Sequence, residues 1–215
     1  MWSDIVFIME IIGTVAFAVS GSIIAAGCGL DLFGVVIVGC STAVSGGMMR
    51  DVLLGRTPPA IFSDITLLTV AAAVSLTVFI IFYINSKRFD LLEKRIESMN
   101  VLFDAMGLAA FSVIGIEAAF DCGFKERALF SISMGVITGI GGGIVRDILV
   151  CKIPYVLKKH IYALASIAGS VAYYYIRIYG NRTVSLVVAV PLIIGIRLLA
   201  AKFRWKLPSV RKTEE

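Results

Sequence analysis

Charged residues are scarce in this chain. They make up 16% of its 215 residues, hydrophobic residues make up 59%, and the mean hydropathy is +0.94. A soluble domain averages about 25% charge, so the composition excludes an ordinary water-soluble fold. The chain also lacks the segments of about ten residues with alternating polarity that build membrane β-barrels. The class that remains is an all-α integral membrane protein that crosses the cell membrane several times.

The side chains that most often perform catalysis or bind metals are equally few. The single histidine, His160, stands beside Lys158 and Lys159, which indicates a membrane interface rather than a metal site. No Ser/His/Asp arrangement, phosphate-loop motif or cluster of metal ligands is present in the sequence. Four cysteines are expected to pack as small apolar thiols rather than as disulfides or metal ligands: Cys28, Cys40, Cys122 and Cys151. The sequence therefore predicts no enzyme, no metal and no cofactor.

The net charge of +5 does not indicate a nucleic-acid partner. The 20 lysines and arginines stand at the ends of long apolar runs, which is how topology is specified in a membrane. A helix needs about 20 apolar residues to cross the hydrocarbon core. Seven runs are candidates: 5–26, 33–51, 62–85, 99–119, 128–150, 158–177 and 183–201.

Seven crossings would place the two termini on opposite sides of the membrane. Thirteen basic residues fall on the side of the C-terminus and six on the other, with Arg197 inside the last run. The positive-inside tendency then places the N-terminus outside and the C-terminus in the cytoplasm. The predicted organisation is a first three-helix repeat (1–85), a cytoplasmic connector with a short interfacial helix (86–98), a second three-helix repeat (99–178), a seventh transmembrane helix (179–201) and a basic cytoplasmic tail (202–215).

The repeat is visible in two blocks of sequence. Residues 42–58 match 138–154 at seven of 17 positions with an offset of 96, and the shared residues include two glycines, an Arg-Asp pair and a proline. Residues 13–29 match 107–123 at eight of 17 positions with an offset of 94. Three helices is an odd number, so the second copy enters the membrane from the opposite side. This arrangement is an inverted-topology repeat, in which the functional site usually lies at the repeat interface.

Glycines interrupt the second helix of each repeat. They have two interpretations. Clustered glycines weaken a helix, so both helices are predicted to break there and line an aqueous path with freed carbonyls. Alternatively, the small residues let two helices approach closely. The candidate pore-lining or kink residues are Thr42, Ser45, Gly46, Gly47, Thr138, Gly141, Gly142 and Gly143.

Charged residues accompany each glycine cluster. Arg50 and Arg146 follow the last glycine by three residues, and Asp51 and Asp147 come next. Buried charges in a membrane usually pair with one another or line a polar cavity. Alternatively, Arg50 is an ordinary arginine at the end of its helix, whose side chain reaches the membrane interface. At the offset of 94, Glu10 corresponds to Asp104. The sequence thus predicts two pseudo-symmetric charge clusters, one near each mouth of a pathway: Glu10, Arg50 and Asp51, and Asp104, Arg146 and Asp147.

One helix face offers small residues for close packing. Gly13, Ala16, Ala18, Gly21, Ala25 and Gly29 lie along the first helix. Such a face serves either an interface between subunits or the core of one subunit, and the sequence does not decide between them.

The paired GG-x-x-RD motifs, on the second helices of two inverted three-helix repeats with a seventh helix added, resemble prokaryotic members of the trimeric intracellular cation (TRIC) channel family. The resemblance spans residues 5–200. It implies a homotrimer in membrane lipid with one pore per subunit, lined by the glycine-kinked second and fifth helices and permeable to potassium or sodium ions. It points to the glycines and Arg-Asp pairs already named.

Two departures qualify this resemblance. Ser45 stands where the second repeat has Gly141, so the first break is expected to be milder. Arg146-Asp147-Ile148 replaces the lysine–glutamate–valine motif of animal members, which puts phosphoinositide binding in doubt. Bacterial relatives with this domain also carry a glycine-transporter label. A secondary transporter of a small zwitterion is therefore the alternative function, and a scaffold without a pathway is a third.

Overall fold

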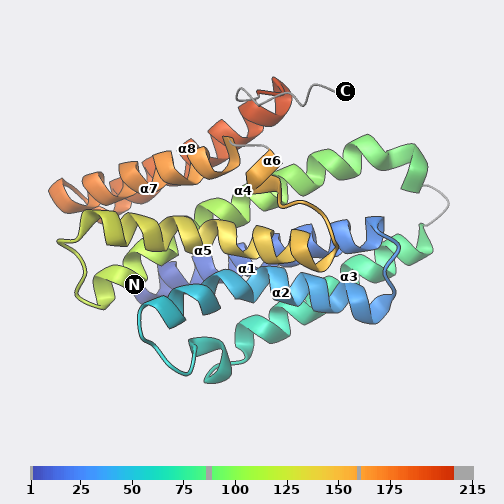
Figure 1. The fold of residues 1–215 in the computed structure, drawn as a ribbon, viewed down its shortest axis with the longest axis horizontal. Coiled ribbons are helices and arrows are strands. Elements are labelled where there is room, and N and C mark those ends of the chain that lie inside the picture. Colours follow the sequence, from blue (N-terminus) through green and yellow to red (C-terminus); the bar gives the residue numbers. More distant parts are fainter. Residues whose placement is uncertain (1, 86–88, 159–160, 206–215) are drawn as a thin grey trace, which may run out of the picture.

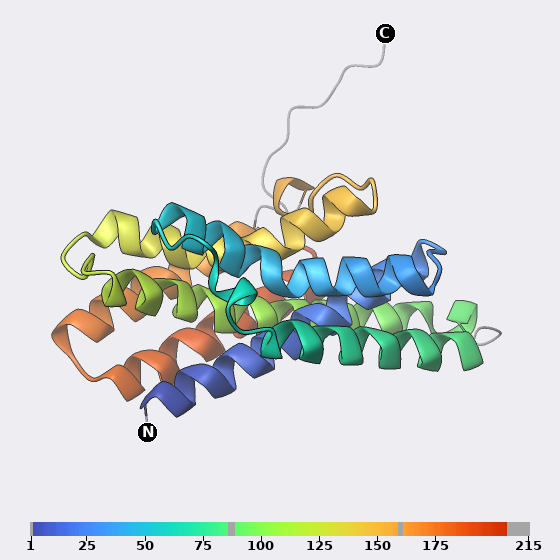
Figure 2. The same ribbon diagram turned by 90° about the horizontal axis from the view of Figure 1, so that it is seen from below.

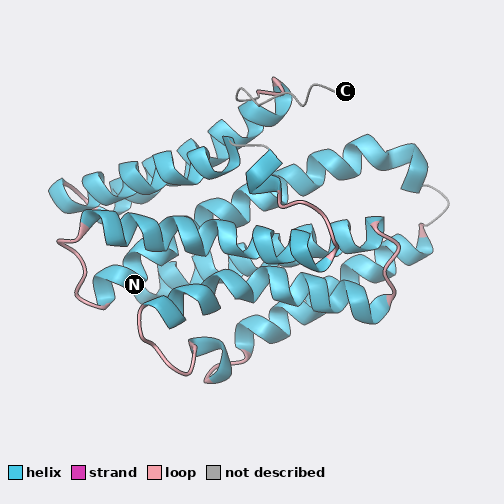
Figure 3. Cartoon of the chain, in the orientation of Figure 1, coloured by secondary structure: helices cyan, strands magenta, loops and turns pink. Residues whose placement is uncertain are grey.

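The structure is a computed structural model that describes residues 2–85, 89–158 and 161–205, and these residues form a bundle of helices (Figure 1). No strand occurs in the described part of the chain (Figure 3). The elements in chain order are α1 (Trp2–Gly27), α2 (Leu32–Leu53), the 3-10 turn η1 (Ala60–Phe62), α3 (Thr66–Ile84), α4 (Phe89–Asp121), α5 (Ala128–Leu149), α6 (Tyr155–Lys158), α7 (Ile161–Tyr179) and α8 (Arg182–Lys202).

Six of these helices are long and apolar enough to cross a membrane: α1, α2, α3, α4, α5 and α8. The protein is therefore a multi-pass membrane protein, as its composition predicts. Helix α7 is as long as α3, at 19 residues. It buries serines and tyrosines against the bundle and carries Arg177 in its last turn, which lowers its apolar content. The crossing by α7, and hence the total of seven, stays a prediction.

Two boundaries differ from the sequence prediction. Residues 89–98, predicted to be a separate interfacial helix, are instead the first turns of α4, which runs unbroken for 33 residues. The rest of that connector, residues 86–88, lies outside the described residues, and so does His160. The run predicted from residue 158 starts at the last residue of the four-residue α6, and α7 itself begins at Ile161. Pro191 lies inside α8 without ending it.

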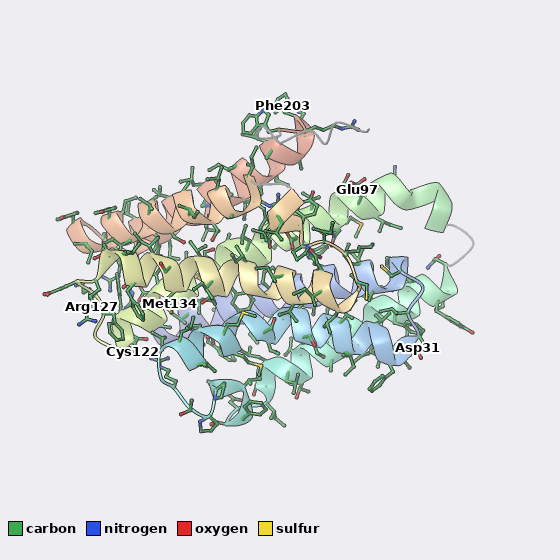
Figure 4. All side chains as sticks on the ribbon, viewed as in Figure 1. Asp31, Glu97, Cys122, Arg127, Met134 and Phe203 are labelled. Carbon is green, nitrogen blue, oxygen red and sulfur yellow. The ribbon has the colours of Figure 1, made fainter. Side chains whose placement is uncertain are left out.

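The inverted repeat extends to the third helix of each copy. Helices α2 and α5 each have 22 residues at an offset of 96, and α3 and α7 each have 19 residues at an offset of 95. Helix α3 packs on α1 and α2, just as α7 packs on α4 and α5. Figure 2 shows α2 and α5 along one side of the bundle and α1 and α3 along the opposite side. Asp31, directly before α2, and Arg127, directly before α5, lie at opposite ends of the bundle, so the two helices are antiparallel (Figure 4).

The glycines of α2 and α5 lie where the two helices pack against each other, and their contacts are reciprocal. A Cβ on Gly46 would overlap the backbone carbonyl oxygen of Thr138, and a Cβ on Gly142 would overlap that of Thr42. These four residues are two equivalent pairs at the offset of 96. Both helices are continuous through their glycines, so the predicted breaks are not present in this structure. Close packing, the second interpretation of these glycines, describes what they do here.

A second reciprocal contact lies beneath this crossing. The rings of Phe17 and Phe111 stack with centroids 5.3 Å apart. Each ring also covers a glycine of the other copy, Phe17 covering Gly107 and Phe111 covering Gly13. The small-residue face of α1 therefore belongs to the core of the subunit, where Ala16, Ala18 and Ala25 are at most 1% exposed. Of that face only Gly29, after the helix end, is exposed.

Candidate functional site

Two charge clusters lie at opposite ends of the antiparallel α2–α5 pair. We call Glu10, Arg50 and Asp51, at the C-terminal end of α2, the first half-site. We call Asp104, Arg146 and Asp147, at the C-terminal end of α5, the second half-site. Five of these six side chains are buried, and Glu10 is half-buried. The structure therefore brings the predicted residues together in the two predicted groups.

The Arg-Asp pair has the same geometry in both half-sites. Arg50 donates through Nε to Oδ1 of Asp51 at 2.8 Å, and Arg146 donates through Nε to Oδ1 of Asp147 at 2.9 Å. The other carboxylate oxygen of each aspartate accepts a backbone N–H from the next short element, at Ala60 (3.0 Å) or Tyr155 (2.6 Å). Each aspartate thus orients its arginine and also anchors the loop that follows its helix.

The second half-site is a closed ion-pair network. Arg146 donates through Nη1 to Oδ1 of Asp104 at 2.7 Å and to the hydroxyl of Ser20 at 2.7 Å. The other carboxylate oxygen of Asp104 accepts from Nη2 of Arg197 at 3.2 Å. Asp104, Arg146 and Arg197 are each 3% exposed. Two cations and two anions, Asp147 included, balance within this buried cluster, which satisfies the requirement that charges inside a membrane be paired.

The first half-site contains a cavity of about 150 Å³ instead. Glu10 and Arg50 both line it, and among the described residues the ion pair of Arg50 is made to Asp51 rather than to Glu10. The further lining residues of interest are Thr14 and Gly47 in the helices, Phe111 at the aromatic stack, and Asp64 in the loop before α3. Asp104 and Arg146 are in contact in the second half-site, whereas the equivalent residues of the first half-site, Glu10 and Arg50, line a cavity.

The cavity lining is acidic overall. It carries three carboxylates, Glu10, Asp51 and Asp64, against the single guanidinium of Arg50. Hydrogen bonds from Thr66, one of them from its backbone N–H at 2.9 Å, hold the pKa of Asp64 below its usual value. Asp64 is therefore charged at neutral pH. The cavity lining at the first half-site therefore has an excess of negative charge, whereas the second half-site together with Arg197 is balanced.

Most of the glycine-region residues lie between the two half-sites and are packed shut. Thr42 and Thr138 are fully buried, and each hydroxyl donates to the carbonyl four residues earlier in its own helix at 2.6 Å. Gly46, Gly141, Gly142 and Gly143 are buried as well. Gly47 lines the open cavity, and the hydroxyl of Ser45 is buried without a hydrogen-bond partner among the described residues. The roles of these residues in a pore stay a prediction.

The sequence does not predict three residues of this network: Arg197, Ser20 and Tyr162, whose hydroxyl donates to Oδ1 of Asp104 at 3.5 Å. The sequence prediction places Arg197 within the last apolar run and gives it no partner. Its presence in the middle of an apolar helix was the available signal, because such a charge is expected to face the interior of the bundle. Ser20 and Tyr162 carried no signal, since their involvement depends on how α1 and α7 pack.

A second network, not predicted from the sequence, centres on Glu117 of α4. This side chain is 3% exposed and accepts from the hydroxyl of Tyr173 at 2.6 Å and from Nε of Arg177 at 3.1 Å. Arg182, at the start of α8, forms a further ion pair with it. Glu117 thereby joins α4 to the end of α7 and the beginning of α8. We interpret it as a structural anchor for this helical hairpin.

Replacing Glu117 with glutamine should lower the stability of the folded protein by about 1.5–3 kcal/mol, the value of hydrogen bonds to charged groups. The carboxylate charge that holds Arg177 and Arg182 would be lost while the side-chain shape is kept. Thermal unfolding of the purified protein in detergent measures the effect. Glu126→Gln is the matched control, because Glu126 is exposed in the loop before α5. Equal unfolding temperatures for both variants would contradict the anchor.

The described residues contain no group of three or more His, Cys, Asp or Glu side chains that could hold a metal ion. The prediction that no cofactor is bound remains a prediction.

Comparison with known proteins gives consistent matches along the chain. A family model described as "Glycine transporter" matches twice, at residues 7–83 and 101–177, and the two matches coincide with the two repeats. The UPF0126 inner membrane protein YadS of Escherichia coli (strain K12) is 37% identical over 208 residues, covering 95% of this chain and 96% of that protein. The UPF0126 membrane protein YvgT of Bacillus subtilis (strain 168) is 36% identical over 203 residues, covering 94% and 95%.

Solved structures match with the same coverage. A prokaryotic TRIC channel crystallised in 0.5 M KCl has a TM-score of 0.85 and 35% identity, covering 96% of this chain and 100% of that one. The TRIC trimeric intracellular cation channel orthologue from Rhodobacter sphaeroides has a TM-score of 0.83 and 28% identity, covering 94% and 99%. The chain therefore belongs to the prokaryotic TRIC channel family, and it matches the glycine-transporter family model and the UPF0126 membrane proteins as well.

Proposed function

We propose that this protein is a monovalent cation channel, permeable to potassium, with one pore per subunit between α2 and α5. The observation that carries the proposal is the pair of charge clusters at opposite ends of one α2–α5 crossing, in a fold that matches prokaryotic TRIC channels over nearly the whole chain. The name of one such neighbour describes a trimer, and we extend this to a homotrimer here. The proposed orientation has the N-terminus outside and the C-terminus in the cytoplasm, following the distribution of basic residues.

The open half-site is suited to collect cations. Its three carboxylates outnumber its single arginine, and a cleft of one charge sign with low-dielectric walls raises the local concentration of the opposite ion. Glu10 and Asp64 contribute most to this effect in our proposal, because Asp51 is already paired with Arg50. Anions would be repelled from the same mouth.

We call the cavity at the first half-site the vestibule. Beyond it, the pathway would pass the glycine crossing. In the structure this crossing is closed by backbone-to-backbone contact. A small separation of α2 and α5 would open it, because the glycines themselves place no side chain between the two helices. The hydroxyls of Thr42 and Thr138 and nearby carbonyls would then be available to replace part of an ion's hydration shell. The structure corresponds in this proposal to a closed state.

One observation favours the alternative of a secondary transporter for a small zwitterion such as glycine. A cavity lies at one half-site and a closed ion-pair network at the other, which is the arrangement expected on one side of an alternating-access cycle. In such a transporter Arg50 would bind the carboxylate of the substrate and Glu10 its ammonium group, because both side chains line the open cavity. The descriptive name of the matching family model points in the same direction.

Bilayer recording of the purified protein separates the two functions. We expect single-channel currents of picoampere size carried by potassium, with a reversal potential in a KCl gradient that follows the potassium equilibrium potential. A carrier turns over far too slowly to give such steps. Silence in the bilayer together with glycine uptake into proteoliposomes made from the same preparation would contradict the channel and support the transporter.

A further inference from the structure

We propose that Arg197, which α8 contributes from outside the repeat, is the positioning residue that keeps the second half-site closed. It acts through Asp104, whose carboxylate it holds on the side opposite Arg146. The proposal deepens the proposed function, because it names how one end of the pathway is shut. The test by bilayer recording rests on the proposed channel function, whereas the test by thiol labelling does not.

The first half-site serves as an internal comparison. The repeat gives both half-sites an acid, an arginine and an aspartate at equivalent positions, so the repeat alone does not explain why only one is closed. In the second half-site Arg146 reaches Asp104 at 2.7 Å, and Arg197 takes the second carboxylate oxygen. Helix α8 has no counterpart in the first repeat. There the acid, Glu10, lines a cavity together with the arginine, whose ion pair in the described residues is made to Asp51 instead.

Arg197 is itself held in a fixed position. Its guanidinium carbon lies 4.5 Å from the ring centroid of Tyr162 and 5.4 Å from that of Tyr155, which are cation–π distances. Tyr162 belongs to α7, and Tyr155 begins the short α6 that Asp147 anchors. The second half-site and Arg197 therefore join α4, α5, α6, α7 and α8 at one point. Arg197 links the loop after α5 to the acid on α4.

The hydrogen bonding of Arg197 is incomplete. Its Nε is buried without a hydrogen-bond partner in the described part of the chain. A buried unsatisfied donor is costly and calls for an explanation. A site optimised only for stability would satisfy this donor or replace the arginine with an apolar residue. In our proposal Arg197 must release Asp104 when the pathway opens. This requirement explains why one of its donors is left without a hydrogen bond.

Charge balance predicts that removing Arg197 and neutralising Asp104 have opposite effects on the entry of cations into the second half-site. Removing Arg197 leaves two carboxylates against Arg146, so the buried site becomes negative and draws in water and cations. Neutralising Asp104 leaves two arginines against Asp147, so the site becomes positive and repels cations. A purely structural role would instead make both substitutions act in the same direction. Arg197→Lys keeps the charge and should behave like the unchanged protein.

The structural test uses thiol labelling, which requires no ion current. The four native cysteines are replaced, and Ser20→Cys is introduced because Ser20 contacts Arg146 inside the closed site. We expect a positively charged methanethiosulfonate reagent to modify this cysteine roughly tenfold faster with Arg197→Gln than with Arg197 or Arg197→Lys, a change within the usual range of coupling between sites. Ala18→Cys, buried in the core away from the half-site, should stay unreactive in every background. Equal rates at Ser20→Cys in all three backgrounds would overturn the proposal.

The electrical test uses the complete protein in bilayers. Arg197→Gln should raise the open probability roughly tenfold, and Asp104→Asn should lower the potassium current by a similar factor. Changes of the same sign in both variants would overturn the proposal. If the unchanged protein carries no current, the channel function fails, and the labelling rates alone then decide whether Arg197 closes the site. If Arg197→Gln does not fold, Arg197→Met replaces it in the labelling test. The proposal is then overturned if Ser20→Cys is modified as slowly with Arg197→Met as with Arg197→Lys and the unchanged arginine.

Discussion

Substituting Gly142 with alanine should destabilise the protein by about 3 kcal/mol or more, the upper end of the cost of overpacking. The added Cβ would overlap the carbonyl oxygen of Thr42 and lie 3.0 Å from the ring of Phe17. A helix backbone cannot yield locally, so α2 and α5 would have to separate. Gly46→Ala should have an equal effect, because its Cβ would overlap the carbonyl oxygen of Thr138. Thermal unfolding in detergent and the yield of folded protein measure both.

Two other glycines in the same protein provide matched controls. The Cβ of Gly47→Ala would have the Nη2 atom of Arg50 at 3.8 Å as its nearest neighbour, and that of Gly195→Ala would meet nothing within 4 Å. Alanine at such helix positions should leave stability unchanged or raise it by about 1 kcal/mol. A loss of stability at all four glycines would contradict the packing role and support a need for helix flexibility.

The second large effect is expected at Asp104. Asp104→Ala removes the only carboxylate between Arg146 and Arg197 in the described structure and leaves two buried guanidinium groups facing each other. Removing one partner of a buried pair typically costs about 3–5 kcal/mol. The unfolding temperature of the purified protein should fall accordingly. Arg197→Met in the same chain should restore part of the loss, because it removes the unpaired cation.

Glu10 is the pseudo-symmetric control for Asp104. It lines an open cavity and is half-buried, so Glu10→Ala should change stability by less than about 1 kcal/mol, as for an exposed ion pair. In the proposed channel it should nevertheless lower the potassium current, because the vestibule loses one of its three carboxylates. Equal stability losses for Glu10→Ala and Asp104→Ala would show that the two half-sites are equally closed. No change of current in Glu10→Ala would remove this residue from the pathway.

Amino-acid order was enough to establish the class and the symmetry of this protein. Composition determined that it lies in the membrane, because its apolar content exceeds what a soluble core can bury. The GG-x-x-RD motifs and the offsets of 94 and 96 placed Glu10 with Arg50 and Asp104 with Arg146. These inferences rest on local sequence patterns. The inverted repeat extends them, because a residue in one copy predicts the place of the equivalent residue in the other copy.

Tertiary packing decided what those residues do. The intrinsic weakness of clustered glycines predicts a helix break, but contact between α2 and α5 stabilises both helices through that region. The repeat predicts two equal half-sites, but α8 lies outside the repeat and supplies Arg197 to only one of them. Which side chains of a distant helix reach a buried carboxylate depends on how the helices pack, and no local pattern encodes that. The difference between an open vestibule and a closed ion-pair cluster therefore belongs to the assembled bundle.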